Sequence, residues 1–501
     1  MEDSLSSELL IESDRHQTRI ALLEEGRAVE IDLERPTERG QVGNIYKGRV
    51  SRVLPGIQAA FVEIGLERDA FLYVGDVDGG RAEVGSLKSR SAELCAERTG
   101  AGKQVRSIEE LVRTGQELLI QVTKDPLPDK GARVTTQLSL PGRLLVLLPR
   151  SPVCGVSRRI TDPQERERLL GLLQELVPAP EGAIVRTAGA GKGSEALRRD
   201  LDHLKGVWQR VQRIADGAAA PVLLRRELDL ELRAVRDVFD DSLEAIRVSG
   251  AEVHRRIDAY LAELDPGLRQ RLRPYDEELE LFERYGVERE IEAALRRKVW
   301  LKSGGYIVVS PTEALVAIDV NTGRFIGAQS LEETVVQTNL EAAREIVRQI
   351  RLRNLGGIVV IDFIDMADPE HRRRVFETLE RELERDRARN QVLGISDFGL
   401  VEITRKRSRP SLERLLTQAC PCCQGRGRVK TPTTLCLDVR REALRNRARF
   451  EGRPLRLRVH PQLARAFEEQ LLGEVEEALR TTIRIEVDPQ LHLEDFEIRE
   501  A

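Results

Sequence analysis

The chain has 501 residues, so we expect several domains, because single hydrophobic cores stop growing at about 250 to 300 residues. Charged residues make up 33% of the sequence but the net charge is only -4, which excludes a polycationic chain; any affinity for nucleic acid must come from local basic patches. No apolar run approaches the roughly 20 residues of a transmembrane helix, and the N-terminus lacks a secretion signal, so we expect a cytoplasmic protein without a membrane span.

The segment 44–76 predicts short alternating strands broken by glycine and proline, and a further strand is predicted at 117–124. Aromatic residues are only 4% of the chain, yet this segment contains Tyr46, Phe61, Phe71 and Tyr73. The basic residues Lys47, Arg49 and Arg52 lie among them. Aromatic and basic side chains on a small barrel are typical of OB-type domains that bind single strands. The alternative is that Phe61 and Phe71 are ordinary barrel core. The glycine- and arginine-bearing segment 79–103 is predicted to be a surface loop.

A glycine-rich segment at 182–194 resembles a nucleotide-binding loop but fails the Walker A pattern at Arg186 and Gly193. A predicted strand ends there in Arg186 and Thr187 and runs into glycines. It offers a guanidinium, a hydroxyl and free backbone amides, all suited to a terminal phosphate. The equally open alternative is a glycine-rich turn before a helix that starts near Ser194.

Further along, a strand–helix–strand unit is predicted. The runs 315–321 and 358–363 are rich in valine and isoleucine and flanked by turn residues, which indicates buried strands. Between them, apolar residues at three- to four-residue spacing predict an amphipathic helix over 331–354. Such a crossover makes the two strands parallel and usually neighbours, about 4.8 Å apart.

Each of these strands carries an aspartate at its carboxyl end, Asp319 and Asp362, at the edge where open α/β sheets bind ligands. Asn321 lies on the same face as Asp319 by the period of two. Two carboxylates and an amide oxygen suit a hard cation such as Mg²⁺. The alternative is a pair of strand-end aspartates that cap the next helix or turn.

Three of the six cysteines cluster at 420–423, and in a cytoplasmic protein we expect thiols or metal ligands rather than disulfides. Cys420 and Cys423 form a CxxC pair, followed by glycines that let backbone amides approach the sulfurs. No second pair follows and no histidine lies nearby in the sequence. Because structural zinc needs four ligands, we expect a Zn²⁺ shared between two chains of a homodimer. Cys422 is a competing ligand, and a redox CxxC or plain buried cysteines are the alternatives.

Together these motifs resemble the ribonuclease E/G family of bacterial endoribonucleases, from about Glu8 to the end of the chain. The resemblance rests on long motifs in one order: Asn-Ile-Tyr-Lys-Gly-Arg-Val (44–50), Ile-Val-Arg-Thr-Ala-Gly (184–189), Ala-Ile-Asp-Val-Asn-Thr-Gly (317–323), Thr-Asn-Leu-Glu-Ala-Ala (338–343), Arg-Leu-Arg-Asn-Leu-Gly-Gly (351–357) and Ile-Asp-Phe-Ile-Asp-Met (361–366). Because the chain stops at Ala501 without a long disordered arm, we expect the shorter type within the family.

The resemblance implies an α/β multidomain fold with seven segments. These are a first RNase H-like segment (1–39), an S1 (OB-fold) RNA-binding barrel (40–136), a 5'-monophosphate sensor (137–230), a second RNase H-like segment (231–294), a DNase I-like catalytic subdomain (295–417), a zinc link (418–431) and a small C-terminal α+β domain (432–501).

The resemblance also assigns roles. It implies catalytic Mg²⁺ on Asp319 and Asp362 with Asn321 in support, RNA contacts at Phe61, Phe71 and Lys130, a 5'-phosphate site at Arg186 and Thr187, and Zn²⁺ on Cys420 and Cys423.

The expected reaction is Mg²⁺-dependent hydrolysis of single-stranded, A/U-rich RNA to 5'-phosphate and 3'-hydroxyl ends, stimulated by a 5'-monophosphate. Ribosomal RNA precursors and messenger RNA are the expected substrates, and a homodimer or homotetramer the expected assembly. One rival function is a non-catalytic S1-type RNA-binding scaffold; another is a metal-dependent phosphatase or DNA nuclease.

Overall fold

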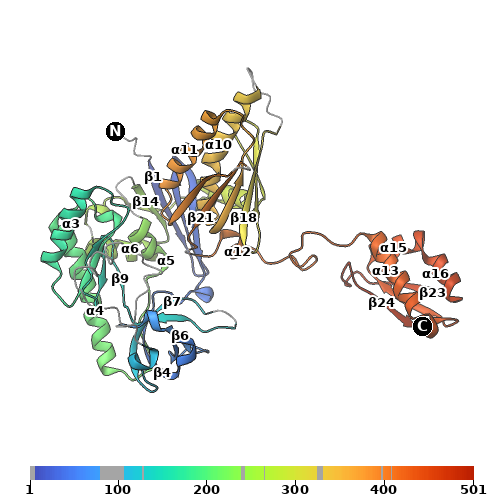
Figure 1. Ribbon diagram of the computed structural model, residues 1–501, viewed down its shortest axis with the longest axis horizontal. Coiled ribbons are helices and arrows are strands. Elements are labelled where there is room, and N and C mark those ends of the chain that lie inside the picture. The colour runs from blue at the N-terminus through green and yellow to red at the C-terminus, as the bar shows by residue number, and fades with distance from the viewer. Residues whose placement is uncertain are drawn as a thin grey trace. The chain divides into compact units, whose positions relative to one another are not determined.

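A computed structural model describes residues 6–78, 107–126, 129–238, 243–264, 266–323, 331–396, 399–407 and 409–501. The chain forms two compact units, Met1–Leu415 and Leu416–Ala501 (Figure 1). The loop predicted at 79–103 lies outside the described residues. None of the described helices is both long enough and apolar enough to cross a membrane.

The first sheet joins two segments that are far apart in the sequence. Its strand order is β15-β14-β1-β2-β3, and β1 pairs antiparallel with β2 but parallel with β14. The strands are β1 (Ser7–Ser13), β2 (Thr18–Glu24), β3 (Arg27–Glu34), β14 (Leu243–Ser249) and β15 (Leu272–Tyr275). Helices α5 (Leu230–Val238) and α6 (Ala251–Leu264) share its hydrophobic core, and the short helices α7 (Pro266–Arg269), α8 (Leu281–Arg284) and α9 (Val287–Ala294) follow.

The segment inserted between these strands contains a closed five-stranded barrel, as the alternating strands predict. Strand β4 pairs with β5 on one side and with β7 on the other, which closes the ring β4-β5-β6-β8-β7, and β13 adds to the outer edge of β4. The strands are β4 (Ile45–Leu54), β5 (Ala59–Glu63), β6 (Ala70–Tyr73), β7 (Glu117–Lys124), β8 (Arg133–Thr135) and β13 (Val222–Arg225), with the short helix α2 (Ile108–Leu111) between β6 and β7.

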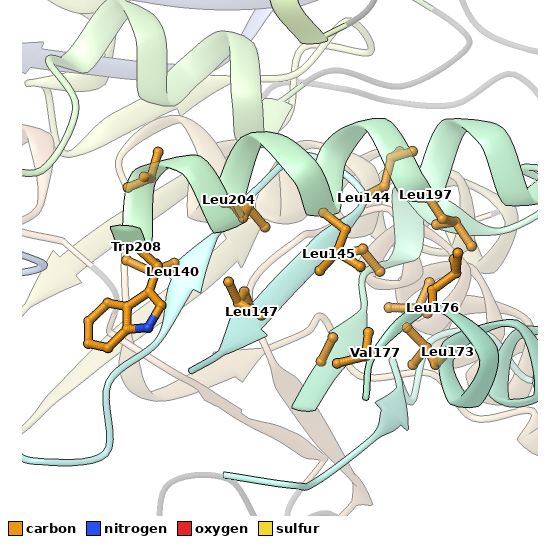
Figure 2. Close-up of a cluster of buried hydrophobic side chains, with 14 of the residues drawn as sticks. Leu140, Leu144, Leu145, Leu147, Leu173, Leu176, Val177, Leu197, Leu204 and Trp208 are labelled. Atoms are coloured by element: carbon orange, nitrogen blue, oxygen red, sulfur yellow. The ribbon is translucent and has the colours of Figure 1, made fainter. Parts of the chain in front are cut away.

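A four-stranded sheet in the order β11-β12-β10-β9 follows the barrel. Its elements are β9 (Leu140–Pro141), β10 (Leu145–Leu148), β11 (Gly155–Val156), α3 (Pro163–Leu176), β12 (Gly182–Val185) and α4 (Ser194–Gly217). Helix α3 begins at Pro163 because Asp162 accepts a hydrogen bond from the Gln164 amide and proline suits the first helical position. Leucines from both helices and β10 form one buried cluster with Trp208, which fixes the helices against the sheet (Figure 2).

The fourth sheet has the order β16-β17-β18-β19-β21-β20, and helices α10 and α11 cover one of its faces (Figure 1). Its elements are β16 (Lys298–Trp300), β17 (Tyr306–Pro311), β18 (Leu315–Asn321), α10 (Leu331–Leu352), β19 (Gly357–Asp362), α11 (Pro369–Glu384), β20 (Asn390–Ile395) and β21 (Leu400–Arg405). Both predicted strands and the predicted helix are confirmed within two residues, as is the parallel pairing of β18 with β19. The short helix α12 (Leu412–Leu416) follows the sheet.

Helix α10 also ties this sheet to the first one. The Arg351 guanidinium, 5% exposed, pairs with Glu24 at 2.6 Å and with Glu30 at 3.0 Å, which lie on β2 and β3. Because a buried guanidinium is costly without partners, these contacts fix α10 on the neighbouring sheet.

The second unit has a three-stranded sheet in the order β23-β22-β24 packed against helices. Its elements are α13 (Pro432–Arg445), α14 (Arg447–Phe450), β22 (Leu455–Val459), α15 (Pro461–Gln470), α16 (Leu472–Leu479), β23 (Ile483–Val487) and β24 (Phe496–Glu500). The strand at 483–487 follows a helix directly, so this unit ends in an ordered sheet.

Candidate functional site

The two strand-end aspartates stand side by side. Asp319 and Asp362 are direct partners in the parallel register of β18 and β19. Along β18 the side chains of Ile318 and Val320 are buried against α10 and α11, while Asp319 between them is exposed. Both carboxylates therefore project from the face of the sheet that the helices leave uncovered.

Asn321 contacts this pair as the period of two predicts. Its Nδ2 donates to Oδ2 of Asp319 at 2.8 Å, which orients that carboxylate. Among the residues that the structure describes, neither aspartate forms an ion pair with a basic side chain, and no group of three or more histidine, cysteine or acidic residues is placed to hold a metal. Two adjacent carboxylates and one amide oxygen fit a hard cation that keeps most of its waters.

Sequence reasoning missed a residue that shapes the backbone beside this site. Asn339, on α10 and fully buried, donates from Nδ2 to the Ile364 carbonyl at 2.8 Å and accepts from the Ile364 amide at 3.1 Å. These two bonds fix the chain just beyond Asp362. The available signal was an amide side chain beside the apolar positions of the predicted helix, and such a group needs a partner when it is buried.

The barrel places Phe61 and Phe71 as direct partners on β5 and β6. Their ring centroids are 5.9 Å apart in an edge-to-face arrangement, and Arg52 lies over the Phe61 ring at 5.4 Å. Both rings are partly exposed and lie outside the buried barrel core. This geometry suits a binding surface better than the alternative of ordinary core.

Of the other two aromatic residues that the sequence singled out in the barrel, one lies in its core and the other on its surface. Tyr46 is part of the buried core, and its hydroxyl donates to Gln41 Oε1 at 2.7 Å. Tyr73 is 42% exposed and lies under Arg133 at 6.0 Å.

Lys130 is exposed on the segment that leads into β8, close in sequence to the Ala132 carbonyl that accepts from the Phe71 amide at 2.7 Å. Gly131 lets this segment approach, because a Cβ there would meet the Asp69 carbonyl oxygen at 1.9 Å. Lys130 is therefore fixed beside the strand that carries Phe71.

Arg186 directly follows β12, and its side chain already forms an ion pair within the protein. Its Nη2 lies 2.8 Å from Oδ1 of Asp237, and its Nη1 donates to the Gly142 carbonyl. Burial raises the pKa of Asp237, but the hydrogen bonds and charges of Arg236 and Arg186 outweigh it and hold that pKa below its ordinary value. Asp237 therefore stays ionised and orients the guanidinium. The sequence pattern gave no signal for this partner, which lies 51 residues away on another element.

Thr187 starts a 3-10 turn, Thr187–Gly189, that leads toward α4. Its hydroxyl lies 3.2 Å from the Ser157 hydroxyl. The prediction of free backbone amides is wrong for most of this loop, because its compact turn uses them internally. The amides of Gly189, Ala190 and Lys192 donate to carbonyls of the loop itself, and the Gly191 amide donates to Oε1 of Glu165 at 2.8 Å. Hydrogen bonds from Arg168 and from that amide lower the pKa of Glu165 to about 2. Helix α4 then begins at Ser194, as predicted.

A second missed residue, Asp200, fixes the loop that receives Arg186. This carboxylate is 3% exposed and accepts from the backbone amides of Leu144 and Leu145, each at 2.8 Å. The same loop provides the Gly142 carbonyl for Arg186. An acidic residue on the inner face of α4 was the signal that sequence reasoning overlooked.

The cysteine cluster lies in the second unit. The described cysteines are all free thiols, as expected, and Cys95 lies outside the described residues. Hydrogen bonds from the backbone amides of Cys423 and Cys422 lower the pKa of Cys420, and the Gly427 amide donates to the Cys423 sulfur at 3.3 Å. No histidine is near in the sequence, but one is near in space: Nε2 of His492 is 2.6 Å from the Cys422 carbonyl oxygen. That ring contacts backbone rather than sulfur, and it reaches the link from 70 residues away.

Comparison with known proteins agrees with this geometry. A family model described as "Ribonuclease E/G family" matches residues 139–408. Ribonuclease G of Escherichia coli (strain K12) and of Salmonella typhimurium (strain SL1344) are each 42% identical over 497 residues, covering 99% of both chains. Ribonuclease E of Escherichia coli (strain K12) is 38% identical over 435 residues, which is 86% of this chain and 40% of that protein. The chain therefore belongs to the ribonuclease E/G family.

Proposed function

We propose that this chain is a Mg²⁺-dependent endoribonuclease of the ribonuclease G type that hydrolyses single-stranded, A/U-rich RNA. Its family and its full-length similarity to ribonuclease G make it an endoribonuclease. The cation, the substrate preference and the stimulation by a 5'-monophosphate are our proposal. The observation that carries it is the direct pairing of Asp319 with Asp362, two exposed carboxylates without basic partners among the described residues.

In this proposal Asp319 and Asp362 are the residues that would hold Mg²⁺. When bound, the cation would polarise a phosphoryl oxygen, favour ionisation of water and stabilise the charge that develops at phosphorus. Asn321 keeps the Asp319 carboxylate oriented through Nδ2, and Asn339 keeps the backbone beyond Asp362 in place. Water attacks phosphorus and the bond to the 3'-oxygen breaks, which leaves a 3'-hydroxyl and a 5'-phosphate.

In this proposal the barrel binds the unpaired bases of the RNA. Phe61 and Phe71 offer partly exposed ring surfaces for stacking, and Arg52 and Lys130 bring positive charge for the phosphates. Single-stranded RNA is the substrate that this surface favours, because paired bases are already stacked and cannot splay onto aromatic rings.

The 5'-monophosphate site is proposed at Arg186 and Thr187. Asp237 and the Gly142 carbonyl hold the guanidinium in one orientation, so that less conformational entropy is lost when it binds a phosphate. The adjoining loop brings the Thr187 hydroxyl to the same place, while its amides at Gly189, Ala190, Gly191 and Lys192 already donate within the protein. The guanidinium and the hydroxyl therefore carry this part of the proposal.

We further propose that Cys420 and Cys423 hold a Zn²⁺ together with the same pair from a second chain, which makes a homodimer or, by pairing of dimers, a homotetramer. The lowered pKa of Cys420 and the amide bond to Cys423 suit thiolate ligands. The double variant Cys420→Ser, Cys423→Ser should lose zinc by elemental analysis and run as a monomer by light scattering. A wild-type dimer that contains no zinc would contradict this.

The names RNase H-like, 5' sensor and DNase I-like for the corresponding segments belong to the same proposal, as do roles in ribosomal RNA maturation and messenger RNA turnover and a cytoplasmic location.

The experiment that tests the function is cleavage of a 5'-phosphorylated, A/U-rich single-stranded RNA in Mg²⁺, with analysis of the product ends. Wild type should make internal cuts that leave 5'-phosphates, and Asp319→Asn should not. Matched DNA should stay intact, since its cleavage would favour the DNA nuclease. RNA binding without cutting by wild type would favour the S1-type scaffold.

A further inference from the structure

A cluster of one cation and two aromatic rings lies at the outer edge of the sheet that carries the candidate carboxylates. The rings of Trp300 and Tyr306 meet edge-to-face with centroids 5.3 Å apart. The Lys298 ammonium lies over both, 3.9 Å from the Trp300 centroid and 3.5 Å from that of Tyr306. We call these three residues the Trp300 platform. Trp300 is 63% exposed, more than any other large apolar side chain in the described part of the chain.

Strand register places the Trp300 platform on the same face as the carboxylates. Trp300 pairs with Tyr306 across β16 and β17, and Tyr306 pairs with Asn321 across β17 and β18. Residues that are direct partners in a sheet project from the same face. Ile307 and Val320, which follow Tyr306 and precede Asn321 in the chain, are buried in the core on the opposite face.

A second row runs through the same face. Lys298 pairs with Val308, Val308 with Asp319, and Asp319 with Asp362. The cation, the rings and the carboxylates therefore lie on one face of the sheet, opposite the face that α10 and α11 cover.

The separation suits neighbouring nucleotides of one strand. Trp300 and Asn321 are two strands apart, about 10 Å, which is about three stacked nucleotides at the rise of a nucleic-acid strand. Among the residues that the structure describes, Lys298 forms no ion pair with an acidic side chain, and its ammonium lies over the two rings instead.

A structural role alone explains these residues poorly. Closing the edge of the sheet needs apolar burial, but most of the Trp300 surface faces solvent. An exposed ring beside an ammonium without an acidic partner in the described residues is the combination that binds a base on its face and a phosphate beside it.

We propose that the Trp300 platform is a base-stacking subsite for a nucleotide that flanks the scissile phosphate of single-stranded RNA. This rests on the proposed function and assigns it a second aromatic contact, separate from the barrel. When RNA binds, a base stacks on Trp300 and the Lys298 ammonium moves from the rings to a backbone phosphate. The subsite thus positions the strand across Asp319 and Asp362.

The tryptophan content gives a direct test. The chain has two tryptophans, and Trp208 is 5% exposed in a leucine cluster, so fluorescence that acrylamide quenches reports Trp300 (Figure 2). In the Asp319→Asn chain, which should hold RNA without cutting it, a short single-stranded RNA should quench Trp300 emission and protect it from acrylamide. If fluorescence anisotropy shows that the RNA binds but the Trp300 emission does not change, the proposed subsite is wrong. RNA that does not bind to the Asp319→Asn chain and is not cut by wild type overturns the proposed function instead.

A second test locates the base. Trp300→Ala should weaken RNA binding about fivefold to thirtyfold, since stacking on an exposed ring is worth the lower part of the range measured per base. Trp300→Phe should restore most of that loss because it keeps an aromatic face.

A series of RNAs, each with one abasic nucleotide at a different position, should identify the base that stacks on Trp300. At that position the missing base should weaken binding to wild type but should not weaken binding to Trp300→Ala any further. Equal additional losses at every position would contradict the proposal. Matching thermal unfolding of the two variants keeps the comparison valid; if Trp300→Ala unfolds, the fluorescence test on the intact chain decides.

Discussion

Replacing Asp362 by asparagine should make the cation-free chain more stable while it abolishes cleavage. The carboxylates of Asp319 and Asp362 are direct partners on neighbouring strands, about 5 Å apart, and both are exposed. Two like charges at that distance repel by about 0.8 kcal/mol in a water-like dielectric, and exposure makes this the appropriate limit. Asp362→Asn removes the repulsion and keeps the shape of the side chain.

Addition of Mg²⁺ should reverse the order. Binding to the native wild-type chain stabilises it by about 2.7 kcal/mol at a hundredfold excess over the dissociation constant, whereas the variant has lost half of the anionic ligands. Without the cation, Asp362→Asn should lose several kcal/mol of charge stabilisation in the transition state. Its cleavage rate should therefore fall about a thousandfold.

The assay is thermal unfolding of both chains in EDTA and in increasing MgCl₂, beside RNA cleavage. In EDTA the midpoint of Asp362→Asn should lie about 1 °C above wild type, and in MgCl₂ below it. Glu402→Gln is the matched control, because Glu402 is exposed on the neighbouring strand β21, where it pairs with Val360 rather than with Asp362. It should behave as wild type in both conditions. A variant that is less stable than wild type in EDTA, or that responds equally to Mg²⁺, would refute the reasoning.

Three other changes test other regions of the molecule. Phe61→Ala should weaken binding of single-stranded RNA by about 1 to 3 kcal/mol, because it removes a stacking face, and an unchanged dissociation constant in a filter-binding assay would exclude the barrel surface. Arg186→Gln should abolish the preference for 5'-phosphorylated over 5'-hydroxylated RNA in competitive cleavage while 5'-hydroxylated RNA is cut as before; a retained preference would remove Arg186 from the sensor. Arg405→Met should destabilise the chain by about 3 to 5 kcal/mol in urea denaturation, since it leaves the buried Asp386, at 2.6 Å, without its partner, and a loss below about 1 kcal/mol would argue against that account.

Local patterns in the sequence predicted the elements that build the candidate metal site. Valine- and isoleucine-rich runs ending in aspartate, with a helical repeat between them, are sufficient to give two adjacent parallel strands, and the side-chain period of two then places Asn321 beside Asp319. The barrel strands followed in the same way from alternation and turn residues.

Contacts between distant segments were beyond this reasoning. Asp237 beside Arg186, Asp200 under the Gly142 loop and His492 against Cys422 depend on how whole elements pack, and no periodicity records that. Trp300 was overlooked for a related reason: its exposure and its alignment with Asn321 appear only once the register of β16 and β17 is known.

The sheet that joins β1 to β14 sets an order of events during synthesis. Strand β1 finds β2 at once, but its other neighbour begins only at Leu243, about 210 residues after β3 ends, a delay of about 10 to 40 s at ordinary rates of translation. Throughout that interval one side of β1 presents unpaired amides and carbonyls, the kind of edge that recruits other chains. The barrel between Ile45 and Thr135 has all its ring strands by then, so the ribosome-bound chain should carry a finished barrel and an unfinished sheet. This topology therefore leaves one edge of β1 accessible to chaperones and to other nascent chains until β14 has left the ribosome.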